Sequence, residues 1–239
     1  MAQPAQSEET RRVITTGNLE VDTKIGGGIP EGSLSLIEGQ SDAGKSVLLQ
    51  QLVWGALVEG FRVIYYTTED TTRSLLRQME SLGMNIIDHF LLGKLNIYPM
   101  PSALNAEQSL TVFSKLIDHM SRQSNYDIAA VDSLTSFVSN VPEHDTLSFL
   151  TACKQICDEN KTLFVTMHAS AFDESMFIRI RSLCDAHLRL RIEEVADQLV
   201  KVLEVAKVHG AEKTTGNIVT FDVEPGLGMK ILPISKAKA

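Results

Sequence analysis

The stretch GQSDAGKS (39–46) carries residue types at the spacing needed to hold phosphate. The residues that fill the pattern G-x-x-x-x-G-K-[ST] are Gly39, Gly44, Lys45 and Ser46. In such a loop, backbone N–H groups and the positive end of the following helix surround the phosphate groups. We therefore expect Lys45 to reach the β- and γ-phosphates of a nucleotide and Ser46 to ligate Mg²⁺. The other residues expected to complete this cradle are Ser41, Ala43 and Val47.

An acidic residue, Asp42, lies in the middle of this loop, although the loop is suited to negative ligands. Because the loop holds phosphate through its backbone, side chains at its variable positions can face away from the ligand. We expect Asp42 to point towards solvent or towards a neighbouring subunit. The alternative for the whole stretch is a glycine turn that joins a strand to a helix and binds nothing.

Asp132 ends the apolar stretch IAAVD (128–132), which predicts a buried strand. An acid at the end of a strand near a phosphate-binding loop can hold Mg²⁺ through water. The small residues after it, Ser133 and Thr135, favour this role. The alternative is a strand-end carboxylate that caps a helix.

Glu69 and Asp70 directly follow the β-branched and aromatic stretch FRVIYYTT (61–68). If this strand lies beside the strand that enters the loop, its acidic end faces the γ-phosphate. Glu69 could then orient and deprotonate a water molecule. The alternative is N-capping of the next helix, which suits Asp70 well.

Alternating strand-like and helix-like segments predict an α/β fold with a mostly parallel central sheet flanked by helices. The expected strands are 34–38, 61–68, 94–100, 127–133, 162–170, 185–193 and 197–208. The expected helices are 45–60, 71–83, 86–92, 106–123, 145–160 and 173–184. Thr71 or Thr72 is expected to cap the second helix, and Gly83 to end it. The last segment, 217–232, is expected to form an antiparallel hairpin that turns at Pro225-Gly226.

The 239 residues predict one domain, 13–233, between a flexible N-terminal tail (1–12) and a flexible C-terminal tail (234–239). The 22 basic and 30 acidic residues give a net charge of −8, which argues against nucleic acid and anionic lipid as partners. The three cysteines, an odd and low number, indicate a reducing compartment. No apolar run approaches the roughly 18 residues that a membrane helix needs.

The chain resembles the KaiC-like branch of the RecA superfamily over nearly its whole length. Four stretches carry the resemblance: TGNLEVDTKIGGGIPEGSLSLIEGQSDAGKS, VIYYTTEDTTRSLLRQMESLGMNI, DIAAVDSLTS and LEVAKVHGAEKTTGNIVTFDVEPGLGM. The segment GGGIPEGS before the strand and the acidic pair after the second core strand are typical of this branch. Within it, a single-domain chain of this size is most similar to the accessory ATPases of the archaellum motor.

The resemblance implies a single RecA-like P-loop domain that binds ATP between the subunits of a homo-oligomer, commonly a hexameric ring. Gly44, Lys45 and Ser46 then match the Walker A positions, Asp132 the Walker B acid and Glu69 the catalytic glutamate. Members of the branch also carry a K-x-R pair that acts in trans on the γ-phosphate of the neighbouring subunit.

In this chain the K-x-R pair reads Lys207-Val208-His209, so the lysine is present and a histidine replaces the arginine. An arginine at such a position contributes roughly 10³ to 10⁵ in rate. Histidine, with a pKa of about 6.5, is mostly neutral at pH 7. We therefore expect His209 to act weakly in trans, and the chain alone to hydrolyse ATP slowly or not at all.

Together, these features predict a nucleotide-dependent assembly or regulatory switch of the archaellum motor. The resemblance implies three partners: the secretion-type motor ATPase, the membrane platform protein and the cytoplasmic ring components. The chain would then be cytoplasmic and reach the inner face of the membrane only through these partners.

Two other functions stay open. One is a KaiC-like autokinase or active ATPase, for which the candidate acceptor hydroxyls are Thr67, Thr68, Thr71 and Thr72. The other is a RadB-like DNA-binding recombinase paralogue, which needs basic or aromatic loops. The segments 133–146 and 169–175 contain no lysine or arginine, which argues against DNA.

Overall fold

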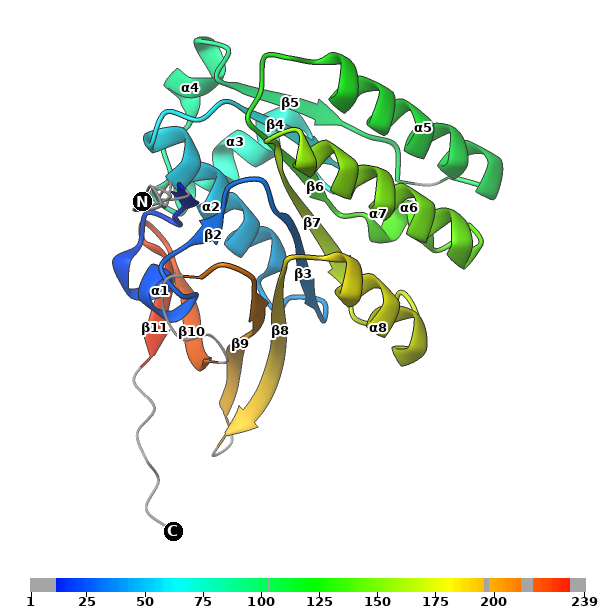
Figure 1. Cartoon of the computed structure of the whole chain (residues 1–239). Coiled ribbons are helices and arrows are strands. Elements are labelled where there is room, and N and C mark those ends of the chain that lie inside the picture. The colour runs from blue at the N-terminus through cyan, green and yellow to red at the C-terminus, as the bar shows by residue number, and fades with distance from the viewer. Residues whose placement is uncertain (1–11, 103, 196–197, 212–216, 233–239) are drawn as a thin grey trace, which may run out of the picture.

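The structure, a computed structural model, describes residues 12–102, 104–195, 198–211 and 217–232. The two expected tails, 1–12 and 234–239, lie outside the described residues apart from Arg12. Within the described ranges, helices cover both faces of one large sheet (Figure 1). The expected α/β fold is therefore confirmed.

The large sheet has nine strands in the order β11-β10-β9-β8-β3-β7-β6-β4-β5. Their bounds are β3 Leu34–Gly39, β4 Val63–Thr67, β5 Leu95–Pro99, β6 Ile128–Asp132, β7 Thr162–His168, β8 Ala186–Val195, β9 Gln198–Val208, β10 Ile218–Glu224 and β11 Gly228–Leu232. Strands β8 to β5 of this order pair in parallel. Strands β9, β10 and β11 add antiparallel pairs, and the last two form the expected hairpin.

The helices lie close to their expected positions. Their bounds are α1 Leu19–Lys24, α2 Lys45–Val58, α3 Thr72–Ser81, α4 Ile87–Leu91, α5 Ala106–Arg122, α6 Thr135–Val138, α7 Glu143–Asp158 and α8 Glu174–Leu183. Thr71 caps α3 by accepting a hydrogen bond from the Ser74 N–H, which confirms one of its two expected caps. The sequence patterns did not reveal α1, α6 or the two-residue strands β1 (Val13–Ile14) and β2 (Ile29–Pro30), because these elements are too short to show a period.

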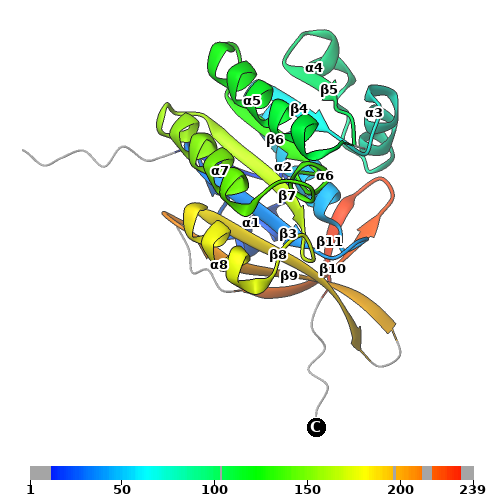
Figure 2. The same cartoon turned by 90° about the vertical axis from the view of Figure 1, so that its right-hand side faces the viewer.

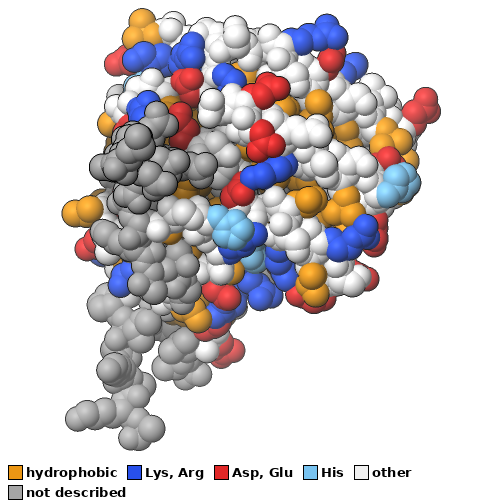
Figure 3. Space-filling model, viewed as in Figure 1, with side chains coloured by type: hydrophobic (Ala, Val, Ile, Leu, Met, Phe, Trp, Pro, Cys, Tyr) orange, Lys and Arg blue, Asp and Glu red, His pale blue; other side chains and the backbone are white. Residues whose placement is uncertain are grey.

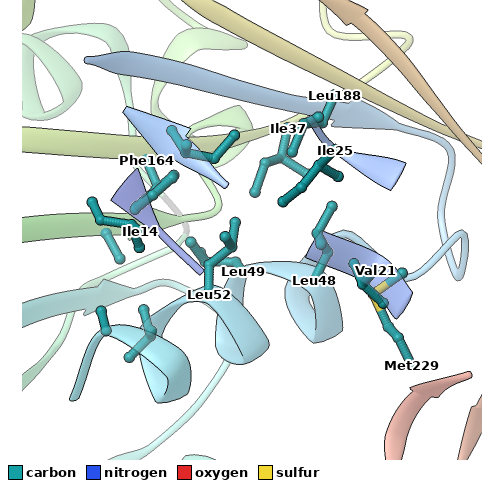
Figure 4. Packing of buried hydrophobic residues seen from close by; sticks show 14 of the residues in the cluster. Ile14, Val21, Ile25, Ile37, Leu48, Leu49, Leu52, Phe164, Leu188 and Met229 are labelled. Carbon is teal, nitrogen blue, oxygen red and sulfur yellow. The ribbon is translucent and has the colours of Figure 1, made fainter. Parts of the chain in front are cut away.

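Each face of the sheet has its own hydrophobic core. On one face, α2 packs through Leu48, Leu49 and Leu52 towards Ile37 and Leu188 of the sheet (Figure 4). On the other face lie α5, α6, α7 and α8 (Figure 2). Because β3 is buried on both sides, the loop that follows it leaves the sheet at a fixed point.

The terminal hairpin closes the α2 side of the molecule. The Met229 N–H donates to Oε1 of Gln51 on α2 at 3.0 Å, and Asn18 Nδ2 donates to the Met229 carbonyl at 2.8 Å. At the turn, the Gly226 N–H donates to the Ser81 carbonyl at 2.8 Å. A side chain at Gly83 would meet the Gly226 carbonyl oxygen at 2.3 Å, so the turn lies directly against the end of α3.

Glu38, the last residue before the loop, is 1 % exposed and lies in a charged cluster under α8. Arg181 of α8 donates to both of its carboxylate oxygens at 2.9 Å, and His187 Nε2 lies 3.0 Å from Oε2. Burial raises the pKa of Glu38, but the hydrogen bonds from His187 and Arg181 outweigh it and lower the pKa from 4.5 to about 2. The carboxylate is therefore ionised in the folded protein at neutral pH.

Replacing this carboxylate should destabilise the protein in a pH-dependent manner. Glu38→Gln should lower the free energy of unfolding at pH 7 by about 3 kcal/mol, because Arg181 and His187 lose a buried negative partner. Since folding lowers the pKa of Glu38, its stabilisation is complete above about pH 4.5 and is lost as the pH falls towards 2. The difference between wild type and variant should therefore shrink below pH 4.5.

Urea unfolding followed by the fluorescence of Trp54, the single tryptophan, measures this difference between pH 3.5 and 7. Glu80→Gln is the matched control, because Glu80 is exposed. A difference under about 1 kcal/mol at pH 7, or one that does not change with pH, would contradict this account of Glu38.

Candidate functional site

The loop between β3 and α2 has the backbone geometry of a phosphate cradle. Gly44 has a φ of +97° and precedes α2, whose first turn has no side-chain cap. The first N–H groups of α2 are therefore free to bind an anion. Asp42, at a φ of +59°, is exposed, and it also lines the pocket described below, so the expected direction of its side chain stays a prediction.

Lys45 lies over this loop and close to three acids. Its Nζ donates to the Gln40 carbonyl at 2.7 Å. Burial lowers the pKa of Lys45, and the charges of Glu69, Asp132 and Asp42 oppose that change. The ammonium therefore sits where a phosphate could replace the carbonyl as its partner.

Asp132 is 2 % exposed and accepts three hydrogen bonds from side chains. Ser46 Oγ donates to Oδ1 at 3.2 Å, Thr166 Oγ1 donates to Oδ1 at 2.7 Å, and Tyr65 OH donates to Oδ2 at 2.8 Å. Burial raises the pKa of Asp132, although these hydrogen bonds work against it. Ser46 and Asp132, the two residues expected to hold Mg²⁺, are therefore in direct contact. No described backbone N–H at a helix start donates to Asp132, so the capping alternative finds no support.

Glu69 follows β4, which pairs with β6, so its carboxylate enters the same pocket as Lys45. Burial and the charge of Asp132 raise the pKa of Glu69, while Lys45 lowers it. Its neighbour Asp70 accepts from Ser74 Oγ at 2.8 Å, and Thr71 provides the cap of α3. Asp70 therefore supports the helix start, and Glu69 is left facing the pocket.

A half-open pocket of about 550 Å³ joins these elements. The residues expected from the sequence that line it are Ser41, Gly44, Lys45, Ser46, Val47 and Glu69, together with Asp42. Gly39, Ala43 and Asp132 are buried and do not line it. Ser133 and Thr135, the small residues noted after Asp132, line the pocket as well, and the lining residues that the sequence did not indicate are Gln78, Ser136, His168, Lys201 and Val223. Of these, His168 had a usable signal, because it ends an apolar strand in the same manner as Asp132.

His168 connects the loop to the end of β7. Its Nε2 lies 3.0 Å from the Ser41 N, and its Nδ1 lies 3.1 Å from the Ser170 N. A neutral imidazole has only one acceptor nitrogen, so the ring can fully satisfy one of these two N–H groups. A phosphate that takes the Ser41 N–H would leave His168 free to bond Ser170.

Lys207 and His209 do not line the pocket of their own chain. Lys207 pairs with His187 across β8 and β9, and its Nζ donates to the Cys184 carbonyl at 2.5 Å. His209 is exposed, and its N–H donates to the Asp185 carbonyl at 2.9 Å. Their expected action on a neighbouring subunit stays a prediction.

The residues of this pocket fit a magnesium nucleotide. Burial raises the pKa of both Glu69 and Asp132; the charge of Asp132 adds to the shift of Glu69, and the charge of Asp70 adds to that of Asp132. A cation in the pocket would relieve this cost. Within the described ranges no cluster of three or more His, Cys, Asp or Glu side chains could hold a metal by itself. Mg²⁺ usually takes few protein ligands together with phosphate oxygens and water, and here Ser46 and Asp132 would be its protein partners.

Comparison with known proteins identifies the family. A family model described as "ATPase: KaiC" matches residues 14–236, and the chain belongs to this family of ATPases. The expected resemblance to the KaiC-like branch is confirmed.

Within the family, the chain is similar to proteins named FlaH. The archaeal flagellar ATP-binding protein FlaH of Sulfolobus acidocaldarius is 34 % identical over 231 residues, which are 95 % of this chain and 100 % of the relative. FlaH of Methanocaldococcus jannaschii is 29 % identical over 216 residues, 89 % of this chain and 91 % of the relative. The crystal structure of the flagellar accessory protein FlaH from M. jannaschii superposes with a TM-score of 0.79 at 27 % identity, covering 93 % of this chain and 99 % of that one.

Two substitutions in the loop should affect nucleotide affinity to very different extents. Lys45→Ala should lower the affinity for Mg-ATP by about 100-fold, because it removes a charged donor to the phosphates. Asp42→Ala, its matched control in the same loop, should leave the affinity within about tenfold of wild type, because Asp42 is exposed. Isothermal titration calorimetry measures both affinities. A hundredfold gain for Asp42→Ala would mean that this acid opposes the phosphates directly.

Proposed function

We propose that the protein binds Mg-ATP in this pocket and serves the archaellum as a nucleotide-controlled assembly switch. The observation that carries the proposal is the convergence of Lys45, Ser46, Asp132 and Glu69 at one half-open pocket. The archaellum and ATP enter the proposal from the names of the FlaH relatives, which are described as archaeal flagellar ATP-binding proteins. In our proposal, ATP bound at the boundary between two subunits favours assembly of identical chains into a ring. The ring would have six copies, the number that the family resemblance implies.

The chain's own residues have separable roles in this proposal. The loop N–H groups and Lys45 bind the phosphates, while Ser46 and Asp132 hold Mg²⁺, the latter through water. Mg²⁺ would neutralise phosphate charge and polarise the γ-phosphoryl group. Glu69 orients a water molecule and accepts its proton, which its raised pKa favours.

Hydrolysis by a single chain should be slow. The cations that line the pocket within the described residues are Lys45 and Lys201, and no arginine lines it. Among the described residues of the same chain, transition-state charge on the γ-phosphate would therefore have no guanidinium partner. In trans, the family positions offer Lys207 and the weakly basic His209.

We further propose that the protein works with the secretion-type motor ATPase, the membrane platform protein and the cytoplasmic ring components of the archaellum. It would act in the cytoplasm and reach the membrane through these partners. The helices of the described ranges include none with the length and apolar character needed to cross a bilayer.

The two alternatives have less support. Of the four candidate acceptor hydroxyls, Thr67 is 1 % exposed and Thr71 caps α3. Thr68 Oγ1 donates to the Ser133 carbonyl at 3.3 Å, which leaves Thr72 as the remaining candidate. The segments 133–146 and 169–175, which flank the pocket, offer no lysine or arginine to DNA. The switch therefore stays the proposal that the pocket supports best.

The association of the protein should depend on nucleotide. Wild type should form larger assemblies with Mg-ATP than without it, whereas Lys45→Ala should have the same size in both conditions, because it lacks the phosphate contact. Size-exclusion chromatography with light scattering measures this, with Asp42→Ala as the control that retains binding. An assembly whose size ignores both the nucleotide and the substitution would overturn the switch.

Turnover should be slow and should depend on Glu69. For the chain alone we expect fewer than about 1 ATP per second, against typical enzyme values of about 1–10³ s⁻¹. Glu69→Gln should reduce turnover by at least about 100-fold and leave ATP affinity within a few-fold. Asp70→Asn, beside it, should change turnover little, because Asp70 supports the start of α3. Equal losses for both variants would remove Glu69 from its assigned role.

A further inference from the structure

The phosphate loop is held from both sides by the strands that flank β3. On the β7 side, His168 Nε2 lies 3.0 Å from the Ser41 N. On the β8 side, the Ile192 N–H donates to Gln40 Oε1 at 3.1 Å. The two contacts differ in kind, because Gln40 takes part through its side chain, whereas Ser41 takes part through a backbone N–H of the kind that binds phosphate.

Backbone N–H groups of the loop carry much of the affinity for phosphate, because the surface offers an anion little long-range attraction. The chain has a net charge of −8, and acidic and basic side chains are interspersed over the face in Figure 3. A phosphate group therefore gains its affinity from the loop rather than from the field of the whole protein. A contact that occupies one loop N–H then competes with phosphate.

His168 reaches the loop from a fixed position at the end of β7. It lies opposite Gly39 in the β3–β7 ladder, and its own N–H donates to Thr135 Oγ1 at 2.8 Å. Its ring lines the pocket. Because the ladder and Thr135 hold its backbone, the ring can change hydrogen-bond partners without a movement of the strand.

Each ring nitrogen of His168 faces the backbone N–H of a different serine. Nε2 lies 3.0 Å from the Ser41 N and 3.1 Å from its Oγ. Nδ1 lies 3.1 Å from the Ser170 N and 2.7 Å from its Oγ. Since a neutral imidazole has one N–H and one acceptor nitrogen, the ring can accept from only one of the two backbone N–H groups.

The two tautomers of the ring therefore suit different serines. With the proton on Nδ1, the ring donates to Ser170 Oγ, and Nε2 accepts from the Ser41 N–H. With the proton on Nε2, Nδ1 accepts from the Ser170 N–H, and the Ser41 N–H needs another acceptor. The tautomer that dominates thus depends on whether another group accepts from the Ser41 N–H.

A phosphate oxygen is such an acceptor. Loops of this kind bind phosphate through their backbone N–H groups, and the Ser41 N–H is one of them. Once phosphate accepts from it, Nε2 can carry the proton, and Nδ1 can accept from the Ser170 N–H. Phosphate binding and the tautomer of His168 are therefore coupled through one hydrogen bond.

We propose that His168 is a positioning residue that holds the Ser41 N–H with its Nδ1-protonated tautomer, and that phosphate must replace it and so moves the ring proton to Nε2. This rests on the proposed binding of Mg-ATP in the pocket, and it names a residue that limits the affinity of that binding. The contact is made with the loop, so ADP and inorganic pyrophosphate should displace His168 as ATP does.

The ¹⁵N chemical shifts of the two ring nitrogens of His168 report its tautomer directly. In the full-length protein, Mg-ATP, Mg-ADP or inorganic pyrophosphate should shift the population from the Nδ1-protonated to the Nε2-protonated ring. His168→Asn identifies the signals by their loss. The ring of His89, on α4 and outside the pocket lining, is the internal control and should not change. An unchanged tautomer of His168 at saturating Mg-ATP would overturn the proposal.

Two substitutions at this position separate the two ring nitrogens. Asn places its amide near the position of Nδ1 and no atom near that of Nε2, so His168→Asn should bind pyrophosphate and ATP about 3- to 10-fold more tightly, the effect of one competing hydrogen bond. Gln reaches the position of Nε2 and can accept from the Ser41 N–H, so His168→Gln should restore the weaker binding. Isothermal titration calorimetry measures both, with His89→Asn as the matched control.

The outcomes separate this inference from the proposed function. Weaker binding by His168→Asn would mean that the ring itself binds phosphate, and the proposed competition would be wrong. If wild type binds neither pyrophosphate nor Mg-ATP, both the inference and the proposed function fall. If Mg-ATP binds and drives assembly while His168→Asn has wild-type affinity, the assembly switch stands and the role of His168 is wrong.

Discussion

The site depends on one packing constraint, which is the passage of Gly39 between two neighbouring strands. Gly39 lies opposite His168 of β7 and Leu190 of β8, and an added Cβ would meet the Leu190 carbonyl oxygen at 2.5 Å. Only glycine fits at position 39, where the chain leaves β3. Because of this close approach, the loop, the start of α2 and the ends of β6 and β7 share one small volume.

Charge balance is the second determinant of the site. Asp132 and Glu69 are held near one lysine, and burial raises the pKa of both acids while it lowers the pKa of Lys45. All three shifts oppose the charged forms, so the ligand-free arrangement is costly. A magnesium nucleotide brings both a cation for the acids and an anion for the lysine, and it can therefore stabilise the pocket as a whole.

The sequence predicted the parts that local pattern determines. Each of these site elements comes at the end of an apolar strand: the loop and its helix after one strand, and Asp132 and Glu69 at the ends of two others. The motif and its place in the predicted strand pattern therefore indicated the same site. The mostly parallel sheet was predicted from the alternation of strand-like and helix-like segments. Lys201 and Val223 could not be found in this way, because they reach the pocket only through the placement of β9 and β10 beyond β8.

The attachment of β11 has a consequence for synthesis on the ribosome. Gln51 finds its hydrogen-bond partner 178 residues later, and Asn18 finds its own 211 residues later, both at Met229. The helix that begins at the phosphate loop therefore lacks this partner for Gln51 until β11 has been synthesised. Non-local pairing of this kind slows folding, so the loop and its helix should reach their final packing only after residue 229 has left the ribosome.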